Sequence, residues 1–529
     1  MPGPVTPDRA AFPRRWGLAF SAAALAALSF PSPLSLSLHP WGAPLAWVAL
    51  APAFALLEGL RPNRAARWGF LFGYLMFGAI IYWIALLVEA KNLKVLGWAA
   101  LTAIMACYPA LFAWLLARLR PAKGPVGSLA AAALWTAVEF FRGSWPFGGF
   151  PWGQIGVAHA VSPALLYWTT WTGVWGLTFL SAYFAREAYR LWAERDDSGI
   201  RGILRRPRAQ AWIGGILCLY VVGHLCCWKP TVGGRTVRVA CLQPSVDQSL
   251  KWTKAYEDAT YGIMERLTRT VTPLDPGLVI WPETAAPSFL RWSPNSMTRV
   301  QGIVGQSGLH TLVGCLDAEK SGNNPSDVRQ YNAAIDFSGA GKPLGTYHKS
   351  HLVPFGEYVP FQKYLTFLGP VVADLGDFNA GSGPVKFEAK GFSYSPMICY
   401  EAIFPRDGRA AADTGADVLV NISNDAWYGR TAALYQHVLL CSVRSAEERR
   451  SMARAANTGI CALVDPSGKI TASTPWYQEE ALVGELPLAQ GQTLYAKWGD
   501  WFPWACVWAS VLGVFAGMVG NRTEMRNLE

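Results

Sequence analysis

The sequence predicts two structural classes in one chain: a multi-pass α-helical membrane domain of about eight helices, and an α/β domain. Of the 529 residues, 52% are hydrophobic and only 16% are charged, whereas soluble domains carry about a quarter charged residues. The mean hydropathy is +0.18. Long apolar runs fill the first 228 residues, and from about residue 235 short β-type runs alternate with amphipathic helical segments.

Eight stretches are candidates for membrane-spanning helices, since a span needs about 20 mostly apolar residues. They are residues 15–31, 42–60, 68–88, 94–117, 126–141, 163–185, 211–228 and 499–520. The first, fifth and seventh are short, and the fifth contains Glu139, so the number is uncertain by one. Arginines before the first run also allow a cleaved signal peptide, although no clear small-x-small cleavage site follows it.

The loops between these stretches alternate in charge. The basic ones carry Arg9, Arg14 and Arg15; Arg61, Arg64 and Arg67; Arg118, Arg120 and Lys123; seven arginines between Arg186 and Arg208; and Arg522 and Arg526. The positive-inside rule therefore predicts cytoplasmic termini. We expect a transmembrane helical domain over 1–228, an extracytoplasmic domain over 229–498, and a last transmembrane helix with a short cytoplasmic tail over 499–529.

Charge and cysteine content exclude several classes of function. The net charge of +10 comes from arginines clustered between apolar runs, which indicates topology and contact with anionic lipid rather than a nucleic-acid partner. The ten cysteines show no C-x-x-C or Cys/His ligand spacing, so we expect no zinc site and read no disulfide framework. No GxGxxG, phosphate-binding loop or GxSxG elbow is present, so no cofactor and no serine-hydrolase chemistry is expected.

The pattern after residue 235 predicts an α/β domain whose sheet faces are covered by helices. Predicted strands are 236–243, 277–281, 311–316 and 416–421, with hairpins at 330–348, 384–399 and 459–474. Predicted helices are 254–270, 296–306 and about 431–453.

Three potentially reactive residues follow apolar strands of this domain: Glu283, Lys349 and Cys399. Strand ends are where α/β sheets present groups to ligands. A thiol needs a base or a neighbouring cation to act as a nucleophile; a carboxylate can take its proton, and an ammonium can stabilise the thiolate and the oxyanion. Taken singly, a buried packing cysteine, a helix-capping glutamate and a solvated lysine explain the three residues equally well.

The surrounding segments favour the interpretation that these three residues are catalytic. They are Trp281-Pro-Glu-Thr284, His348-Lys-Ser-His-Leu-Val-Pro-Phe-Gly-Glu-Tyr-Val-Pro360, Ile398-Cys-Tyr-Glu401 and Asn421-Ile-Ser-Asn-Asp-Ala-Trp427. They resemble the nitrilase, or carbon–nitrogen hydrolase, superfamily. With Gln243-Pro and Gln248-Ser-Leu-Lys-Trp252, essentially the whole chain resembles the bacterial apolipoprotein N-acyltransferase family.

The resemblance implies a fold, a reaction and a set of partners. The fold is an αββα sandwich. The reaction moves an acyl chain from a phospholipid, through a thioester, to the α-amino group of a diacylglyceryl-cysteine on an apolipoprotein. The implied location is the bacterial inner membrane with the catalytic domain on the periplasmic side, and we expect a monomer.

The resemblance also implies residue roles. Glu283 is the general base, Lys349 stabilises the oxyanion and thiolate, and Cys399 is the nucleophile. Glu357 orients Lys349 or the incoming amine, unless it forms only an ordinary salt bridge. The remaining implied supporting or substrate-binding residues are Tyr400, Glu401, Trp252, Trp152 and Asn332. The cysteines Cys241, Cys315, Cys441 and Cys461 match no family role and are expected to pack in the core.

Two segments have open roles. The loop Gly143–Trp152, rich in glycine, proline and aromatic residues, is either an interfacial turn or the floor of a lipid-fed site. The apolar run Tyr364–Val372 is either a lid that shelters the acyl-enzyme or a buried core helix. Two other functions remain possible at this stage: a membrane-tethered amidase that hydrolyses small amides, and a non-enzymatic scaffold.

Overall fold

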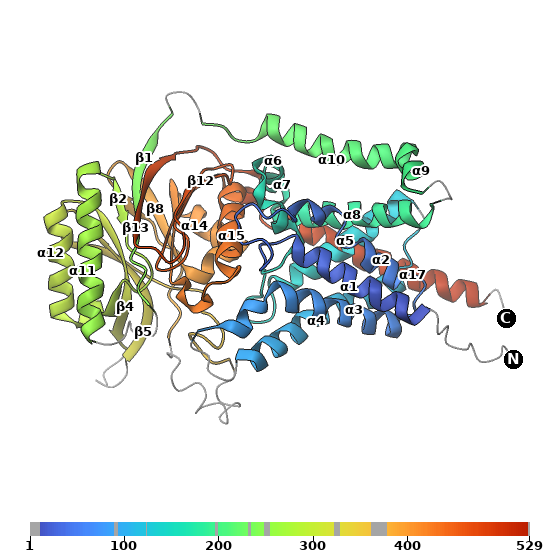
Figure 1. The fold of residues 1–529 in the computed structure, drawn as a ribbon, viewed down its shortest axis with the longest axis horizontal. Helices are drawn as coiled ribbons and strands as arrows, with labels where there is room; N and C mark the ends of the chain where they lie inside the picture. The colour runs from blue at the N-terminus through green and yellow to red at the C-terminus, as the bar shows by residue number, and fades with distance from the viewer. Residues whose placement is uncertain are drawn as a thin grey trace.

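The computed structural model describes residues 11–88, 94–122, 124–195, 199–230, 234–247, 254–321, 328–360 and 378–526. A bundle of helices stands beside a two-sheet α/β part, and both chain ends lie at the end of the bundle away from the sheets (Figure 1). The run 364–372 and Trp252 lie outside the described residues.

The bundle is built from long helices joined by short ones. The long helices are α1 (Ala11–Leu28), α3 (Pro62–Ile80), α4 (Lys94–Leu119), α5 (Pro125–Arg142), α8 (Val174–Ala193), α10 (Pro207–Cys226) and α17 (Trp501–Arg526). The short ones are η1 (Ala43–Trp47), α2 (Ala51–Leu57), η2 (Tyr82–Leu86), η4 (Ile155–Val161), α6 (Pro163–Leu166), α7 (Thr169–Thr172) and α9 (Gly199–Arg205). Gly69 and Gly73 let α3 approach α4 so closely that a Cβ at either position would collide with Pro109.

Three of the expected helices are not continuous. The stretch 42–60 divides into η1 and α2, because Pro52 has no N–H to continue the first helix and instead starts the second. The stretch 68–88 divides into the end of α3 and the 3-10 helix η2. The stretch 163–185 divides into α6, α7 and α8, because Gly173 adopts a φ of +64° between α7 and α8. The other predicted helices are present with shifted ends.

Two of the described helices are long and apolar enough to cross a membrane on length and composition: α4 and α10. Shorter apolar helical stretches cover Ala43–Leu57 and Trp501–Gly517. The other long helices carry charged side chains, such as Glu139 of α5 and Glu187 of α8. By these criteria, two of the eight expected spanning helices have direct support.

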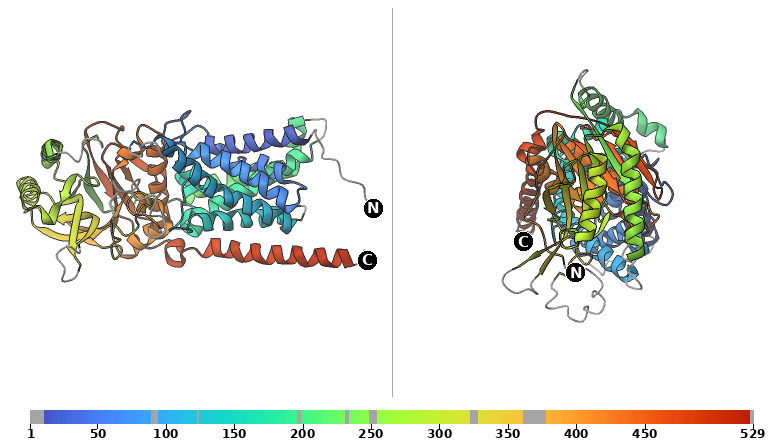
Figure 2. Two further views of the ribbon diagram at one scale, coloured as in Figure 1. Left: turned by 90° about the horizontal axis from the view of Figure 1, so that it is seen from below. Right: turned by 90° about the vertical axis from the view of Figure 1, so that its left-hand side faces the viewer.

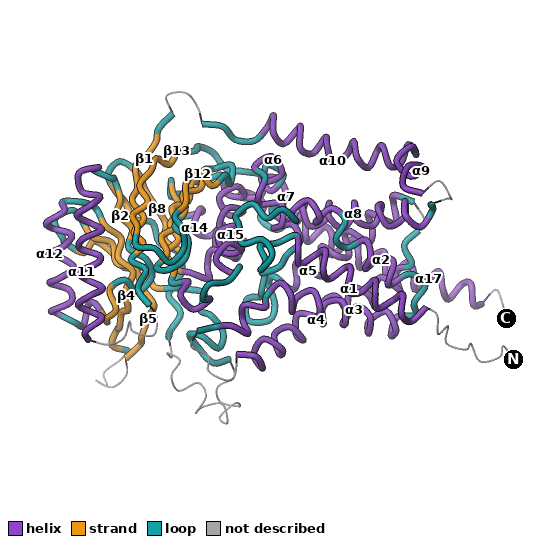
Figure 3. Tube along the Cα trace, viewed as in Figure 1, coloured by secondary structure: helices purple, strands orange, loops and turns teal. Residues whose placement is uncertain are grey.

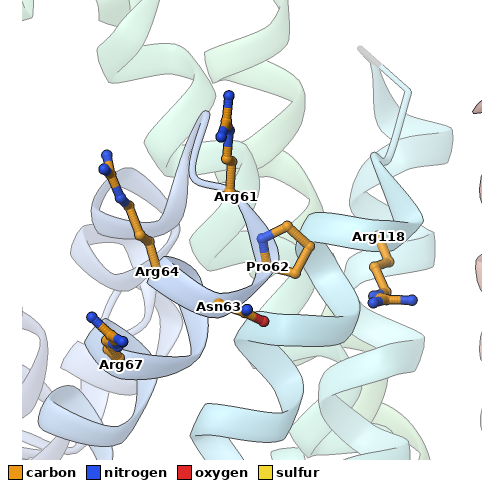
Figure 4. Close-up of a pocket in the computed structure, with 6 residues that line it drawn as sticks. All are labelled: Arg61, Pro62, Asn63, Arg64, Arg67 and Arg118. Carbon is orange, nitrogen blue, oxygen red and sulfur yellow. The ribbon is translucent and has the colours of Figure 1, made fainter. Parts of the chain in front are cut away.

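The basic loops gather at one end of the bundle. The backbone N–H of Val88, just before α4, donates to the carbonyl of Trp427 in the α/β part. From there α4 extends about 39 Å away from the sheets, at about 1.5 Å per residue. Its last turn carries Arg118, which lines a hollow with Arg61, Arg64 and Arg67 of the α2–α3 loop and α3. These arginines fan outward rather than toward a common point (Figure 4), which is typical of a basic rim and not of a ligand site.

The α/β part contains two sheets. The first has the order β13-β1-β2-β4-β5-β6, with β3 paired to β4 beside this path; the second has the order β12-β11-β10-β9-β8-β7. The first is formed by β1 (Thr236–Gln243), β2 (Leu278–Ile280), β3 (Ala286–Phe289), β4 (Thr311–Lys320), β5 (Val328–Phe337), β6 (Pro343–His348) and β13 (Glu480–Pro487). The second is formed by β7 (Phe387–Ala389), β8 (Phe392–Ile398), β9 (Val418–Ser423), β10 (Ser451–Ala456), β11 (Ala462–Val464) and β12 (Ile470–Ser473).

The two sheets face each other between helical layers (Figure 3). Along β1, Val239 and Cys241 pack between the sheets, and Ala240 and Leu242 pack outward under α11 (Lys254–Val271) and α12 (Pro294–Ser307). The second sheet is covered by α14 (Pro405–Asp413) and α15 (Ala433–Glu448). The resulting order of layers is the predicted αββα sandwich, and α15 lies between the second sheet and the bundle (Figures 1 and 2).

The predicted strands and hairpins of this part are confirmed, as are the helices predicted at 254–270 and 296–306. The single helix predicted over 431–453 is wrong. Arg449, at a φ of +50°, ends α15, and Ser451–Ala456 then forms β10, which pairs in parallel with β9. A short, fully buried apolar run has no periodicity that separates a strand from a helix. Neither β3 nor β13 was predicted.

Buried carboxylates occupy the last turn of α15, where it faces the bundle. Glu447 accepts a hydrogen bond from the backbone N–H of Val174, at the start of α8, at 2.8 Å. Both carboxylate oxygens of the adjacent Glu448 are buried and have no hydrogen-bond partner among the described residues. Burial, reinforced by the charge of Glu447, raises the pKa of Glu448 to about 8.

This carboxyl predicts a pH-dependent stability. Its ordinary pKa is 4.5, so between that pH and about 8 the folded protein binds one more proton than the unfolded chain. The free energy of unfolding therefore falls as the pH rises through this window and is level above it. Glu448→Gln should raise stability at pH 9 by up to about 5 kcal/mol, since one unit of pKa corresponds to about 1.4 kcal/mol, and leave it nearly unchanged at pH 4.5. Thermal melts of both proteins across this range measure the effect, and an equal gain at both pH values would contradict it.

Candidate active site

Glu283 lies just after β2, and both of its carboxylate oxygens are engaged. Oε1 accepts a hydrogen bond from Asn332 Nδ2 at 2.7 Å, and Oε2 accepts one from the backbone N–H of Asn424 at 2.6 Å. Asn332 lies on β5 of the first sheet, while Asn424 follows β9 of the second. The carboxylate is therefore fixed from both sheets at once.

Lys349 follows β6 directly and is 1% exposed. Its Nζ lies 2.9 Å from Glu357 Oε1 and 2.8 Å from Oε2. Asn332 Nδ2 also donates to Glu357 Oε1, at 2.9 Å. One amide thus bridges the two carboxylates, and a continuous polar chain runs from Glu283 through Asn332 and Glu357 to the ammonium of Lys349.

Cys399 forms the junction between β8 and the short helix η8 (Cys399–Ile403). Its φ of +52° lies in the left-handed region that a side chain with a Cβ rarely adopts. Its carbonyl accepts hydrogen bonds from Asn421 Nδ2 and His437 Nε2, each at 3.3 Å. Thr284, directly after Glu283, has a φ of +50°. Strained residues of this kind cluster at functional sites.

The pKa shifts show that the three residues act on one another. Burial raises the pKa of the Cys399 thiol, and the charge of Glu283 raises it further, against the opposing effect of Lys349. Burial alone would lower the pKa of Lys349, but the charges of Glu357, Glu283 and Cys399 outweigh it and raise that pKa. The resting site therefore holds an ammonium and a neutral thiol, rather than the thiolate that a cation alone would favour.

Glu401 holds the backbone of the cysteine turn against the segment that carries Lys349. Its carboxylate accepts backbone N–H bonds from Ile398 at 2.6 Å, Ser350 at 2.8 Å and His351 at 3.0 Å. The hydroxyl of Tyr347 donates to it at 2.7 Å. Since Ile398 and Ser350 adjoin Cys399 and Lys349 in the chain, this carboxylate sets the spacing of the two reactive residues.

A buried ionic network lies behind the cysteine and was not predicted. Arg454 of β10 donates to Asp425 Oδ2 at 2.6 Å and contacts His437 Nδ1 at 3.1 Å, and all three residues are fully buried. Asn421, whose amide holds the Cys399 carbonyl, accepts a bond from the same guanidinium. The segment from Asn421 to Trp427 carried part of the signal, but His437 lies in the stretch 431–453 that was predicted as one long helix, and Arg454 directly follows that stretch.

The aromatic residues join the site to the bundle. The hydroxyl of Tyr400 lies 3.4 Å from the carbonyl of Gly149 in the loop 143–152. Trp152, at the end of this loop, is 2% exposed and packs on Trp83, with ring centroids 4.8 Å apart. Trp145, at its tip, is 68% exposed. The tip of the loop is therefore exposed and its end is buried against α15, while its role as an interfacial turn or as the floor of a lipid-fed site stays a prediction.

Two other sequence predictions concern cysteines and metals. Cys241, Cys315, Cys441 and Cys461 are fully buried, which confirms their packing role.

Ligand atoms of Asp317, Glu319 and His348 lie within 4.8 Å of one another. Arg291, however, donates to both of these carboxylates, so this cluster is an ion-pair network that already contains its cation.

Comparison with known proteins agrees with the geometry. The pattern of the carbon–nitrogen hydrolase family matches residues 238–496, the part that forms the two sheets. A solved structure similar to this part is an amidase from Nesterenkonia sp., 18% identical, covering 49% of this chain and 93% of the amidase with a TM-score of 0.36. The match of the family pattern identifies residues 238–496 as a carbon–nitrogen hydrolase domain.

The pattern of the apolipoprotein N-acyltransferase N-terminal domain matches residues 22–186. The apolipoprotein N-acyltransferase of Geobacter metallireducens is 35% identical over 95% of both chains. That of Methylococcus capsulatus is 34% identical over 92% of this chain and 93% of the relative. The chain therefore belongs to the apolipoprotein N-acyltransferase family. It is an acyltransferase, which sets aside both the tethered amidase and the scaffold.

The contacts of Glu401 predict a structural requirement at the cysteine turn. Glu401→Met leaves the backbone N–H groups of Ile398, Ser350 and His351 buried without an acceptor, each at a cost of about 1–3 kcal/mol. We expect a lower melting temperature and faster alkylation of Cys399 by a small maleimide. Tyr347→Phe, which removes only one donor to Glu401, is the control and should change both quantities much less. Equal effects of the two substitutions would contradict the anchoring role.

Proposed function

We propose that this chain takes an acyl chain from the sn-1 position of a phospholipid, such as phosphatidylethanolamine, and carries it as a thioester on Cys399. The acceptor is the α-amino group of the N-terminal S-diacylglyceryl-cysteine of an apolipoprotein. The observation that carries this proposal is the buried polar chain from Glu283 through Asn332 and Glu357 to Lys349, whose two ends both act on the thiol of Cys399 through their charges. The family name of the relatives supports the class of acceptor.

In the first half-reaction Cys399 is the nucleophile and Glu283 the general base. The thiol proton passes to the Glu283 carboxylate as sulfur attacks the ester carbonyl. Lys349 stabilises the negative charge that develops on the carbonyl oxygen. The C–O bond then breaks, and Glu283 returns the proton to the leaving alkoxide, which departs as a lysophospholipid. The raised pKa of Cys399 supports a base-assisted attack instead of a preformed thiolate.

In the second half-reaction the neutral amine of the lipoprotein attacks the thioester. Glu283 accepts a proton from the amine, Lys349 again stabilises the oxyanion, and the C–S bond breaks. The proton passes from Glu283 to the departing sulfur, which restores the thiol, and the product is an amide. Because the two substrates use one site in turn, ping-pong kinetics are expected.

Glu357, Asn332 and Glu401 are positioning residues in this scheme, since they act through Lys349, Glu283 and the cysteine turn. Tyr400 and Trp152 line the side that faces the bundle, and the backbone N–H of Tyr400 adds an oxyanion donor. Trp252, near the acyl-chain entrance, and a lid at Tyr364–Val372 remain predictions from the sequence.

The proposed membrane arrangement has eight spanning segments, with residues 1–228 and 499–529 forming the membrane domain and 229–498 the catalytic domain. The catalytic domain is on the periplasmic side of the inner membrane. The gathering of basic residues at the end of the bundle opposite the sheets supports this orientation. The substrates then reach the site from the membrane face of the domain, and the enzyme acts as a monomer.

The acyl-enzyme is the direct test of this mechanism. The purified protein incubated with phospholipid should gain one acyl group on Cys399, seen by mass spectrometry, and lose it when a diacylglyceryl-cysteine peptide is added. Glu283→Gln removes the base and should slow acylation by about 10²–10⁴-fold. Cys399→Ala should abolish acylation. An acyl group on another residue, or peptide acylation by Cys399→Ala, would contradict the proposal.

The orientation is tested separately with reporter fusions. Alkaline phosphatase, which is active only outside the cytoplasm, should be active when fused after residue 230. Green fluorescent protein, which folds in the cytoplasm, should fluoresce when fused after residue 529. The reverse pattern would contradict the proposed topology, but it would not bear on the proposed mechanism.

A further inference from the structure

Gln436 lies in the first turn of α15. Its side chain makes four hydrogen bonds, and all four are to residues of the helical bundle. Its Oε1 accepts the indole N–H of Trp152 at 2.5 Å and that of Trp83 at 3.2 Å. Its Nε2 donates to the carbonyl of Pro31 at 2.8 Å and to that of Ile80 at 3.2 Å. A primary amide has two donors and two acceptor lone pairs. All four are used, and they join three separate segments of the bundle to one residue of the catalytic domain.

The next residue, His437, contacts the nucleophile's backbone. Its Nε2 lies 3.3 Å from the carbonyl oxygen of Cys399, and its Nδ1 lies 3.1 Å from a guanidinium nitrogen of Arg454. A carbonyl only accepts, so the contact with Cys399 requires a ring proton on Nε2. Nδ1 also lies 3.3 Å from Oδ1 of Asp425, so it faces both a guanidinium and a carboxylate. Burial and the charge of Arg454 lower the pKa of His437, against the opposing effect of Asp425.

We propose that Gln436 is a positioning residue that couples the helical bundle to the cysteine turn. Trp83, Trp152 and two bundle carbonyls fix the first turn of α15, and His437 transmits that position to the strained backbone of Cys399. Trp152 also packs on the His437 ring, with centroids 5.6 Å apart. The inference rests on the proposed role of Cys399, and it gives the bundle a part in setting the geometry of the nucleophile.

A second contact between the helical bundle and the residues that pack against it does not include Cys399, and it provides a control. The hydroxyl of Tyr495 donates to Asp500 Oδ1 at 2.8 Å, and the indole N–H of Trp175 of the bundle donates to the same oxygen at 3.1 Å. Tyr495 is fully buried. Tyr495→Phe therefore removes a hydrogen bond in which neither Cys399 nor the two residues that bind its carbonyl, Asn421 and His437, take part.

The first experiment compares Gln436→Met with Tyr495→Phe in the full-length protein reconstituted with phospholipid. Met has similar size but cannot pair with the two indoles and two carbonyls. We expect Gln436→Met to lower the rate of Cys399 acylation about 10- to 100-fold, the scale of a displaced reacting group. The phospholipid concentration for half-maximal rate should change less than about twofold, and Tyr495→Phe should retain more than half the rate.

The second experiment uses Gln436→Glu, whose behaviour depends on protonation. The protonated carboxyl accepts from an indole and donates to one carbonyl, as the amide does. The ionised carboxylate faces the carbonyl oxygens of Pro31 and Ile80 and repels them. The acylation rate relative to wild type should therefore rise as the pH is lowered from 8 to 5.5, a signature that a purely structural loss does not produce.

The outcomes separate this inference from the proposed function. Equal rates for Gln436→Met and Tyr495→Phe, or a pH-independent ratio for Gln436→Glu, would overturn the coupling while leaving the thioester mechanism intact. Peptide acylation by Cys399→Ala would instead overturn the mechanism itself. If Gln436→Met does not accumulate as folded protein, as judged by its thermal melt, the pH dependence of Gln436→Glu decides the question.

Discussion

The arrangement of the site depends on a positive charge that is buried next to a thiol. The ammonium of Lys349 is almost entirely removed from water, and a buried charge is tolerated only when it is paired and hydrogen-bonded. Glu357 supplies the opposite charge, and Asn332 links that carboxylate to Glu283. Each group therefore fixes the next, and a base and a cation are both available beside Cys399 without prior movement of side chains. A preorganised site of this kind stabilises developing charge more effectively than mobile water does.

The two sheets supply the framework for this chain of contacts. Glu283 and Lys349 follow strands of the first sheet, and Cys399 and Asn424 follow strands of the second. Face-to-face packing of the sheets brings these four strand ends together, and Glu401 closes the gap by binding backbone N–H groups on both sides. The left-handed backbone of Cys399 persists because its carbonyl is held by Asn421 and His437 and the preceding backbone N–H is held by Glu401. Buried Arg454 supports the same turn from behind, where an unpaired guanidinium would be strongly unfavourable.

The helical bundle contributes to the site as well as standing beside it. The helix α15 has one face on the second sheet and the other on the bundle, so successive residues, about 100° apart around the helix, can face Cys399 and the bundle in turn. Gln436 and His437 are the clearest case, because neighbouring side chains point to the two sides. The loop 143–152 reaches Tyr400 in the same region. The chemistry of the α/β domain and the packing of the bundle therefore meet within one turn of one helix.

The sequence by itself determined the two-part organisation, the αββα layers and most strands, and it singled out Glu283, Lys349, Cys399 and Glu357 as candidates for one site. Apolar run length, strand periodicity and the residues of specific motifs are local properties, so they can be read along the chain. It misread residues 449–453 as the end of a helix, because a short, fully buried run has no period that separates a strand from a helix. It also missed Gln436, His437 and Arg454, whose partners lie up to 405 positions away in the chain. Only the tertiary structure decided these contacts, because hydrogen bonds between distant segments exist only after the sheets, α15 and the bundle have packed.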